Sequence, residues 1–336
     1  MSVHRDRIYL VAFLLGAGGL LFAGRDLLQG SVLITWGLTF GGTTAVVVLA
    51  VSLYRVRLDL QASRIELARK AAELSFALQV QRALFPRQFP ATSGLEFTAV
   101  CIPAHGISGD YYDVIQLQDG RIVFAIADIS GKGIPAAILM ANLQALLRTM
   151  ADIGRSPGEV VSRLNHHLNQ VTDESKFATF FYAEWNPRHR ALSFVNAGHL
   201  PPVMVGSCRG VKLDKGGFPL GVFRNADFEV GELTMQPGDM LVLYSDGITE
   251  ATSDAGEQFE ERRLQQAVEE RCGAPLLEIQ SHILDALHSW SDKEPEDDMT
   301  LLIVRAIDSG KEKSSESAAM VSGTMRPHRS DEKLRS

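Results

Sequence analysis

The sequence is poor in cysteine, with three in 336 residues, at Cys101, Cys208 and Cys272. They are odd in number, far apart in the chain and without CxxC spacing. This pattern excludes a disulfide scaffold and argues against a zinc site. We interpret the three as reduced thiols of a cytosolic domain.

The sequence also lacks an excess of basic residues. Its 33 Lys and Arg are outnumbered by 40 Asp and Glu, which gives a net charge of -7. Proteins that bind nucleic acid usually carry a basic stripe, so this balance argues against a nucleic-acid partner. Hydrophobic residues make up 46% of the chain. That share excludes a fully disordered or collagen-like protein.

Charged residues are absent from two N-terminal stretches, 8–24 and 31–54. Because a bilayer span needs about 17–25 apolar residues, residues 1–54 are predicted to form a membrane anchor with two transmembrane helices in a hairpin. Arginines precede the first stretch and follow the second. The positive-inside bias therefore predicts a multi-pass protein of the cell inner (plasma) membrane with a cytoplasmic catalytic domain. A signal peptide is the alternative for the first stretch, although its removal would leave the second span in place.

Residues 55–86 contain neither Gly nor Pro before Pro86. Leucines recur at a seven-residue spacing at Leu60, Leu67 and Leu74, which predicts a coiled-coil linker helix. One interpretation is a homodimer formed through this helix. The other is an amphipathic helix that packs on its own domain.

Residues 87–307 alternate between strand-like and helix-like segments. Apolar runs at hairpin spacing favour a mixed or antiparallel sheet packed with helices, an α+β fold. Strands are expected at 121–128, 177–186, 191–198, 201–206, 239–247 and 299–307. Helices are expected at 134–153, 158–172, 260–271 and 275–290. The tail, 308–336, has no aromatic residue and no apolar period, and is predicted to be disordered.

Four aspartates stand at strand ends or in glycine-containing turns: Asp110, Asp128, Asp246 and Asp297. Each one alone is compatible with an ordinary turn or helix N-cap. As a set they suggest a cation site, because converging carboxylates repel one another unless cations neutralise them. Sites built only from oxygen ligands suit Mg²⁺ or Mn²⁺. The sequence therefore predicts a site for divalent cations.

Five motifs carry a family resemblance. They are, in chain order, SGDYYD (108–113), ADISGKG (127–133), NAGHLPP (196–202), SDGITEA (245–251) and DDMT (297–300). Together they resemble the PPM/PP2C-type serine phosphatases of the bacterial RsbU/SpoIIE group, over about residues 70–307. The resemblance implies a PP2C-like β-sandwich flanked by helices, in α-β-β-α layers.

The same resemblance implies an activity and its partners. The activity is hydrolysis of phosphoserine or phosphothreonine on a regulatory protein, by attack of a hydroxide that bridges two divalent cations, Mn²⁺ or Mg²⁺. The suspected substrate is a phosphorylated anti-sigma-factor antagonist of the STAS type. A covalent serine or cysteine route has no support, because the sequence has no GxSxG and no C-x5-R.

Carried over residue by residue, the resemblance also assigns ligand roles. Asp128 matches the carboxylate that bridges the two cations, and Ile129 would offer its backbone carbonyl to the second. Asp246 and Asp297 match the other ligands of the first cation. Asp110 matches an acid that holds a metal-bound water or binds metal directly.

Four further residues are candidates for contacts around these ligands or with phosphate. His199 and Glu250 fall where animal-type relatives place acids for an additional metal, and a histidine argues against that extra site. His105 stands where those relatives have a phosphate-binding arginine, with an ordinary loop histidine as the alternative. Asp298 follows the ligand Asp297 directly.

Two other classes of protein share part of this pattern. A catalytically weak, phosphatase-like signalling scaffold would keep the fold, but all four acids are present here. A nucleotide cyclase would also combine membrane helices, a coiled coil and metal-binding aspartates. A cyclase would not need SDGITEA or DDMT near its C-terminus, so the phosphatase is the preferred interpretation.

Overall fold

The structure is a computed structural model. It describes residues 16, 18–19, 22, 32–90, 94–104, 106–153, 156–172, 176–207, 209–291 and 293–308. The chain divides into two compact units, Met1–Glu73 and Leu74–Ser336. Apart from Asp308, the predicted disordered tail lies outside the described residues.

Helix α2 (Val32–Leu84) begins in the first unit and ends in the second. It contains nearly all of the second predicted span, 31–54. Within the described ranges, Trp36–Leu84 is the helix long and apolar enough to cross a membrane, by length and composition. The first predicted span, 8–24, lies almost wholly outside the described residues. The two-helix hairpin therefore stays a prediction.

The second unit contains two β-sheets. The first has the strand order β1 (Leu95–Ile102), β10 (Met299–Ala306), β9 (Met240–Tyr244) and β6 (Val203–Val205). The second has the order β2 (Tyr111–Gln116), β3 (Ile122–Ile129), β4 (Ala178–Asn186), β5 (Ala191–Ala197) and β7 (Gly216–Gly217), and β8 (Gly231–Thr234) also pairs with β5. Paired strands are antiparallel except β5 and β7. This is the mixed arrangement that hairpin spacing predicts.

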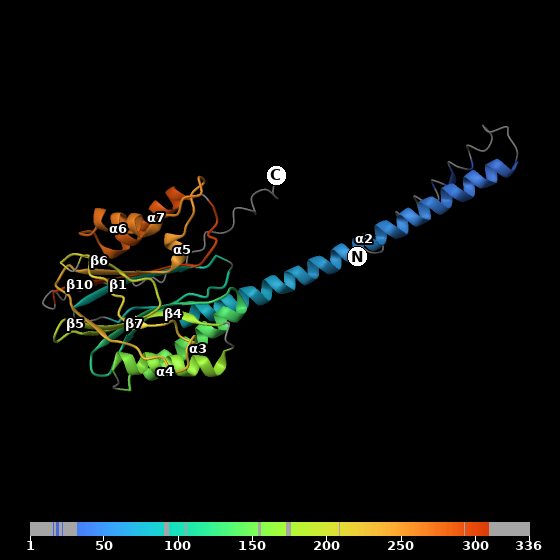
Figure 1. Ribbon diagram of the computed structural model, residues 1–336. Helices are drawn as coiled ribbons and strands as arrows, with labels where there is room; N and C mark the ends of the chain where they lie inside the picture. The colour runs from blue at the N-terminus through green and yellow to red at the C-terminus, as the bar shows by residue number, and fades with distance from the viewer. Residues whose placement is uncertain are drawn as a thin grey trace. The chain divides into compact units, whose positions relative to one another are not determined.

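Helices cover the outer face of each sheet. Helices α3 (Ile134–Met150) and α4 (Pro157–Val171) contact the second sheet, and α6 (Glu260–Glu270) and α7 (Leu276–Trp290) contact the first. Figure 1 shows the resulting order of layers, with α6 and α7 above the two sheets and α3 and α4 below them. The predicted α-β-β-α sandwich is confirmed.

The first sheet is buried on both of its faces. In β9, Leu241 and Leu243 belong to the core between the sheets, whereas Met240, Val242 and Tyr244 belong to the core under α6 and α7. Successive side chains of a strand point to opposite faces. A strand with a core on each side therefore reads as a continuous apolar run, which is how 239–247 stands out in the sequence.

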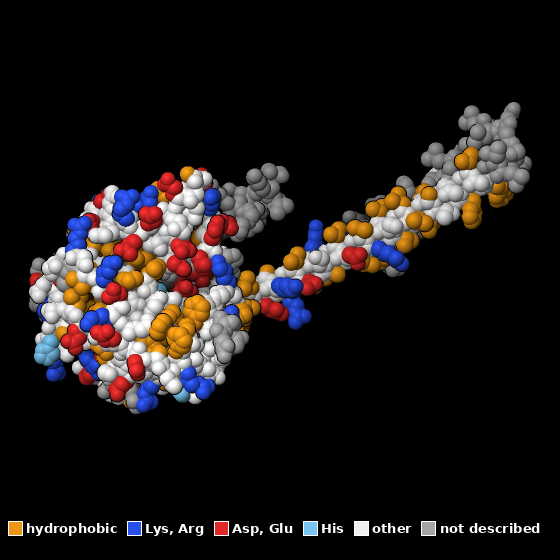
Figure 2. Space-filling view, viewed as in Figure 1, with side chains coloured by type: hydrophobic (Ala, Val, Ile, Leu, Met, Phe, Trp, Pro, Cys, Tyr) orange, Lys and Arg blue, Asp and Glu red, His pale blue; other side chains and the backbone are white. Residues whose placement is uncertain are grey.

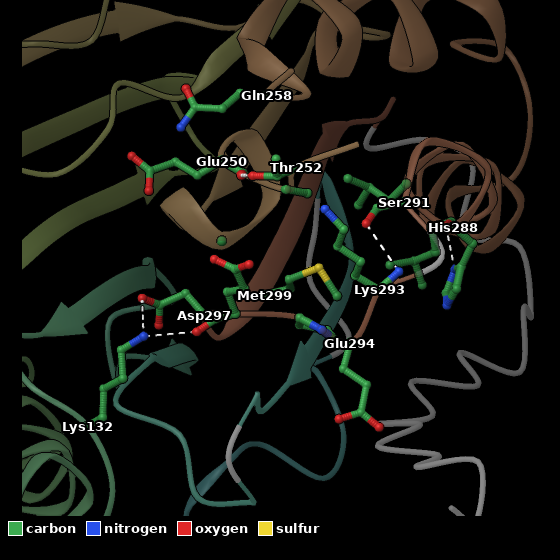
Figure 3. Close-up of a pocket in the computed structure, with 16 residues that line it drawn as sticks. Lys132, Glu250, Thr252, Gln258, His288, Ser291, Lys293, Glu294, Asp297 and Met299 are labelled. Carbon is green, nitrogen blue, oxygen red and sulfur yellow. Dashed lines mark hydrogen bonds and ion pairs between the residues drawn. The ribbon is translucent and has the colours of Figure 1, made fainter. Parts of the chain in front are cut away.

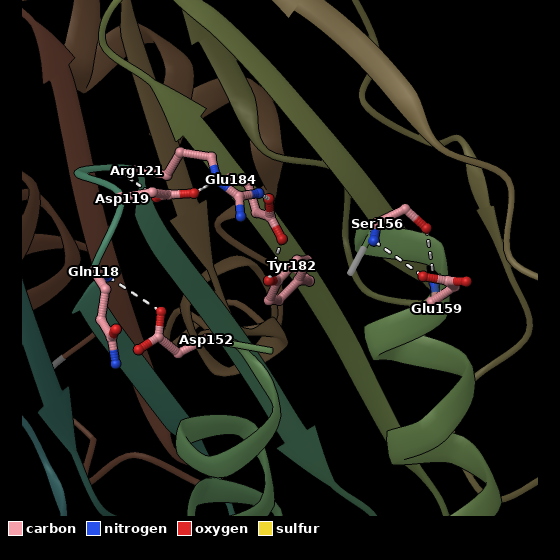
Figure 4. Close-up of polar contacts among 8 residues, drawn as sticks. All are labelled: Gln118, Asp119, Arg121, Asp152, Ser156, Glu159, Tyr182 and Glu184. Carbon is pink, nitrogen blue, oxygen red and sulfur yellow. Dashed lines mark hydrogen bonds and ion pairs between the residues drawn. The ribbon is translucent and has the colours of Figure 1, made fainter. Parts of the chain in front are cut away.

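Polar contacts fix the ends of several elements (Figure 4). Ser156 caps α4: its Oγ accepts from the Glu159 N–H at 3.4 Å, and its own N–H donates to Glu159 Oε2 at 3.2 Å. Arg121 pairs with Asp119 at 2.7 Å and with Glu184. This ion pair holds the end of β3 where the strand begins. The opposite end of β3 carries Asp128.

Candidate active site

Asp128 lies at the far end of β3, opposite Thr179 of β4. Burial raises the pKa of its carboxyl to about 7, and the nearby acids Asp246 and Asp297 act in the same direction. Gly131 and Gly133 follow with φ of 98° and 74°. Only glycine adopts such angles without strain. These two residues therefore allow the sharp turn from β3 into α3.

Asp246 and Asp297 come from the other sheet. Strands β9 and β10 are antiparallel neighbours, so residues just after β9 and just before β10 lie at the same end of the sheet. Asp246 begins the short helix α5 (Asp246–Thr249), and burial followed by repulsion from Asp297 raises its pKa. A Cβ on Gly247 would clash with the Asp298 carbonyl oxygen, so only glycine permits this close approach.

Asp110 immediately precedes β2 and is 2% exposed. Its Oδ2 atom has no hydrogen-bond partner among the described residues. Burial, followed by repulsion from Asp128, raises the pKa of this carboxyl well above its usual range, and the hydroxyls of Thr300 and Ser245 moderate the rise. A buried carboxylate oxygen without a partner is costly, which indicates a missing ligand.

Asp298 holds the loop that leads to Asp110. Its Oδ1 accepts from the Ala104 N–H at 2.8 Å, and its Oδ2 accepts from the Gly109 N–H at 2.7 Å. A Cβ on Gly109 would lie 3.2 Å from the Ile129 carbonyl oxygen. The carbonyl of Ile129 therefore faces this loop, while the Ile129 side chain is buried in the core. The structure thus gives Asp298 a positioning contact.

Gln81, near the end of α2, holds the same loop from the other side. Its Nε2 donates to the Ser108 carbonyl at 2.6 Å, and its Oε1 accepts from the Ser108 N–H at 3.0 Å. Sequence reasoning missed this residue. The signal was available, because Gln81 lies seven residues after Leu74 and places a buried amide on the leucine stripe.

His199 is buried and joins three strands. Its Nε2 lies 3.1 Å from the Tyr244 carbonyl and so donates, which leaves Nδ1 to accept from Thr179 Oγ1 at 2.8 Å. Burial lowers its pKa to about 4, so the ring is neutral near pH 7. With both ring nitrogens engaged, His199 has a structural role and has no lone pair left for an additional metal. His105 lies outside the described residues.

A pocket of about 260 Å³ opens beside these acids (Figure 3). Asp297, Gly247 and the exposed Glu250 line it, together with residues of α7 and the segment before β10. Lys132 lies at the same pocket, with its Nζ 3.0 Å from Asp297 Oδ2. Figure 2 shows acidic side chains gathered on one part of the surface in view.

Within the described ranges, no three His, Cys, Asp or Glu side chains converge closely enough to hold a metal ion. The acids still interact, because Asp246 and Asp297 raise the pKa of Asp128. The donor set fits divalent cations: it consists of oxygens, one of them is orphaned and buried at Asp110, and the cluster already attracts the Lys132 ammonium.

Solved structures with this fold are PP2C-type phosphatases. The SiaA-PP2C domain of Pseudomonas aeruginosa superposes with a TM-score of 0.62 at 22% identity, over 71% of this chain and 98% of that one. The RsbU and RsbW domains of Rv1364c from Mycobacterium tuberculosis give a TM-score of 0.59 at 24% identity, over 67% and 63%. These likenesses define the fold class as PP2C.

Sequence comparison defines the family. The profile described as "Stage II sporulation protein E (SpoIIE)" matches residues 118–307. Phosphoserine phosphatase RsbU of Bacillus subtilis (strain 168) is 33% identical over 237 residues, which cover 70% of each chain. Protein IcfG of Synechocystis sp. is 30% identical over 226 residues, and the chain spans 35% of IcfG. The chain belongs to the SpoIIE family of PP2C-type phosphatases and is an enzyme of that class.

Proposed function

We propose that the protein is a membrane-anchored, metal-dependent phosphatase that removes phosphate from serine or threonine of a regulatory protein. The observation that carries this proposal is that Asp128 interacts with Asp110 of its own sheet and also with Asp246 and Asp297 of the other sheet. Acids that repel one another at one end of the sandwich are costly unless cations neutralise them. A cation-dependent reaction gives them a use.

Asp128, Asp246, Asp297 and the Ile129 carbonyl would hold two divalent cations, Mn²⁺ or Mg²⁺. When bound, such cations provide a water-derived nucleophile near neutral pH and offset phosphoryl charge. The Oδ2 atom of Asp110 is available to accept a hydrogen bond from the attacking water, which would orient it. Asp298 and Gln81 fix the loop that carries Asp110 and so set the position of that oxygen.

The proposed substrate is a phosphorylated anti-sigma-factor antagonist of the STAS type. Two observations support a phosphoprotein substrate: the relative RsbU is a phosphoserine phosphatase, and a structural neighbour joins an RsbU domain to an RsbW domain. The pocket beside Asp297 is open to the surface and has room for side chains next to a phosphoserine. The complete set of acids argues against the alternative of a catalytically weak scaffold.

We also propose the predicted organisation of the chain: an anchor at 1–54, a linker at 55–86 and a phosphatase domain at 87–307. Helix α2 runs without interruption from Val32 to Leu84, so the second span and the linker form one helix. Leu60 and Leu67 are 57% and 63% exposed, which leaves their stripe available to a second copy of the helix. Both ends of the anchor would face the cytoplasm.

The decisive experiment is a phosphatase assay of the full chain, purified with detergent, on a phosphoserine peptide with Mn²⁺. Asp128→Asn should lower kcat/KM by roughly a thousandfold or more, because the bridging ligand is lost. Asp285→Asn on the exposed face of α7 is the matched control and should leave the rate unchanged. Activity retained in Asp128→Asn would remove the metal assignment, and an inactive wild-type chain would favour the scaffold.

A further inference from the structure

Lys132 places a positive charge against the acidic cluster. Its Nζ donates to Asp297 Oδ2 at 3.0 Å and to the Glu296 carbonyl at 2.9 Å (Figure 3). It also lowers the pKa of Asp128 and of Asp246, so its field reaches both carboxylates. The sequence motif gives this lysine no role, since GKG is not part of a P-loop and its glycines explain the turn.

The ion pair occupies an oxygen that a metal ligand needs. Asp297 Oδ1 accepts the Asp298 N–H at 2.9 Å, and Asp297 Oδ2 accepts from Lys132. Both oxygens of this carboxylate are therefore engaged. A divalent cation and an ammonium group at the same carboxylate oxygen repel each other, so the two compete for Oδ2.

We infer that Lys132 is a tethered counter-cation, which neutralises the acidic cluster while divalent cations are absent and swings away from Asp297 when they bind. The inference rests on the proposed metal site and concerns its regulation. The side chain of Lys132 is 54% exposed and has four rotatable methylenes, so the ammonium can move into solvent. The turn around it need not move, because Gly131 and Gly133 set its backbone.

Two consequences follow from this competition. Without divalent cations, the ammonium reduces repulsion among the carboxylates and stabilises the folded protein. When divalent cations bind, the Lys132 ammonium must leave Asp297. It then remains near the bound cations and repels them, because both are positively charged. A unit charge within about 6 Å of a divalent ion at a solvent-exposed site changes binding by a factor of about ten. Lys132 therefore raises the cation concentration that the enzyme needs.

The test is calorimetric titration of Mn²⁺ into the full chain at low ionic strength, for the wild type, Lys132→Met, Lys132→Arg and Lys293→Met. Lys293 is the matched control, because it lines the same pocket but donates to the Ser253 carbonyl at 3.2 Å. Lys132→Met should bind Mn²⁺ about tenfold more tightly than the wild type. The other two variants should stay within about twofold of it.

Thermal unfolding supplies a second readout that does not depend on turnover. Without Mn²⁺, Lys132→Met should unfold at a lower temperature than the wild type. On saturation with Mn²⁺, its unfolding temperature should rise by more than that of the wild type. If the wild type binds Mn²⁺ and Lys132→Met binds it equally, this inference is overturned while the proposed function stands. The inference is also overturned if Lys293→Met gains as much Mn²⁺ affinity as Lys132→Met does. If neither the wild type nor Lys132→Met binds Mn²⁺, the metal site and the inference both fail.

Discussion

Asp110 and Asp113 belong to one motif but differ in the partners that the fold gives them. Both are buried, at 2% and 0% exposure. Asp113 receives two hydrogen bonds from Arg148, at 2.7 and 2.8 Å, and one from the Tyr111 hydroxyl at 2.5 Å. Asp110 keeps an oxygen without a partner among the described residues and faces another acid, Asp128.

The difference separates an acid that is paired within the protein from one that we propose acts in the active site. The protein supplies its own arginine to Asp113, which ties α3 to β2 and leaves no charge to neutralise. Among the described residues no arginine pairs with Asp110, and burial and repulsion from Asp128 disfavour its ionised form, so a bound cation would stabilise the carboxylate. Burial alone therefore does not distinguish the two acids, whereas the presence or absence of a pairing side chain does.

The largest effect is expected for Asp110→Asn. We expect kcat/KM to fall by about 10²–10³-fold, because the group that orients water is altered. The free energy of unfolding without metal should stay the same or rise, since a neutral amide replaces a carboxyl whose ionised form burial and Asp128 disfavour. Enzyme assays and urea unfolding measure the two quantities. If Asp110→Asn lost as much stability as Asp113→Asn, the proposed difference between the two aspartates would be contradicted.

Asp113→Asn should act on stability instead. Replacing this carboxylate leaves the guanidinium of Arg148 poorly paired; because that side chain is 44% exposed, we expect a cost below the about 3–5 kcal/mol of breaking a fully buried pair. Tyr111→Phe is the graded control, because it removes one hydrogen bond worth about 1 kcal/mol. Urea unfolding of both variants gives the comparison, and activity below the unfolding transition should remain. A stable but inactive Asp113→Asn would contradict this assignment.

His199 predicts a pH dependence of stability. Its folded pKa of about 4 lies below the unfolded value near 6.5, so the unfolded state binds the proton more readily. The stabilising contribution is complete above pH 6.5 and is lost as the pH falls towards 4, by about 2–3 kcal/mol. The difference between wild type and His199→Gln in unfolding experiments from pH 7 to 4 isolates this slope from that of the acids. Parallel curves would contradict the neutral, buried ring.

Gln81→Leu should give the smallest change. The loop before Asp110 would lose one of its two supports, and we expect kcat/KM to fall by about fivefold, with a loss of about 1–3 kcal/mol in stability from the unpaired Ser108 backbone. Gln79→Leu, exposed on the same helix, is the control and should change neither quantity. Equal effects of the two substitutions would show that the amide contact does not position Asp110.

Local patterns predicted much of this molecule. Apolar runs located β3, β9 and β10 because these strands are buried, and acids at strand ends located Asp128 and Asp246. Contacts between residues far apart in the sequence could not be predicted from local patterns. The pairing of Leu95 with Ala306 has no local signal, and neither does the clamp from Asp298 to Gly109.

The packing partner of the linker helix also could not be predicted from local sequence. Its heptad stripe predicts a face that packs, but spacing does not say against what. In the structure the end of that stripe packs on its own domain: a Cβ on Gly106 would lie 3.5 Å from Leu74, and Gln81 binds Ser108. Leu60 and Leu67, earlier in the helix, remain exposed. The end of the helix therefore packs on its own domain, while the homodimer through its earlier part stays a prediction.

We propose that the four acids at the end of the sandwich form a site for two divalent cations. Calorimetric titration of the full chain with Mn²⁺ is the direct test. We expect two ions to bind per chain, and Asp128→Asn to lose that binding while the protein remains folded by circular dichroism. A wild-type chain that binds no Mn²⁺, or an Asp128→Asn variant that binds it as the wild type does, would contradict the claim.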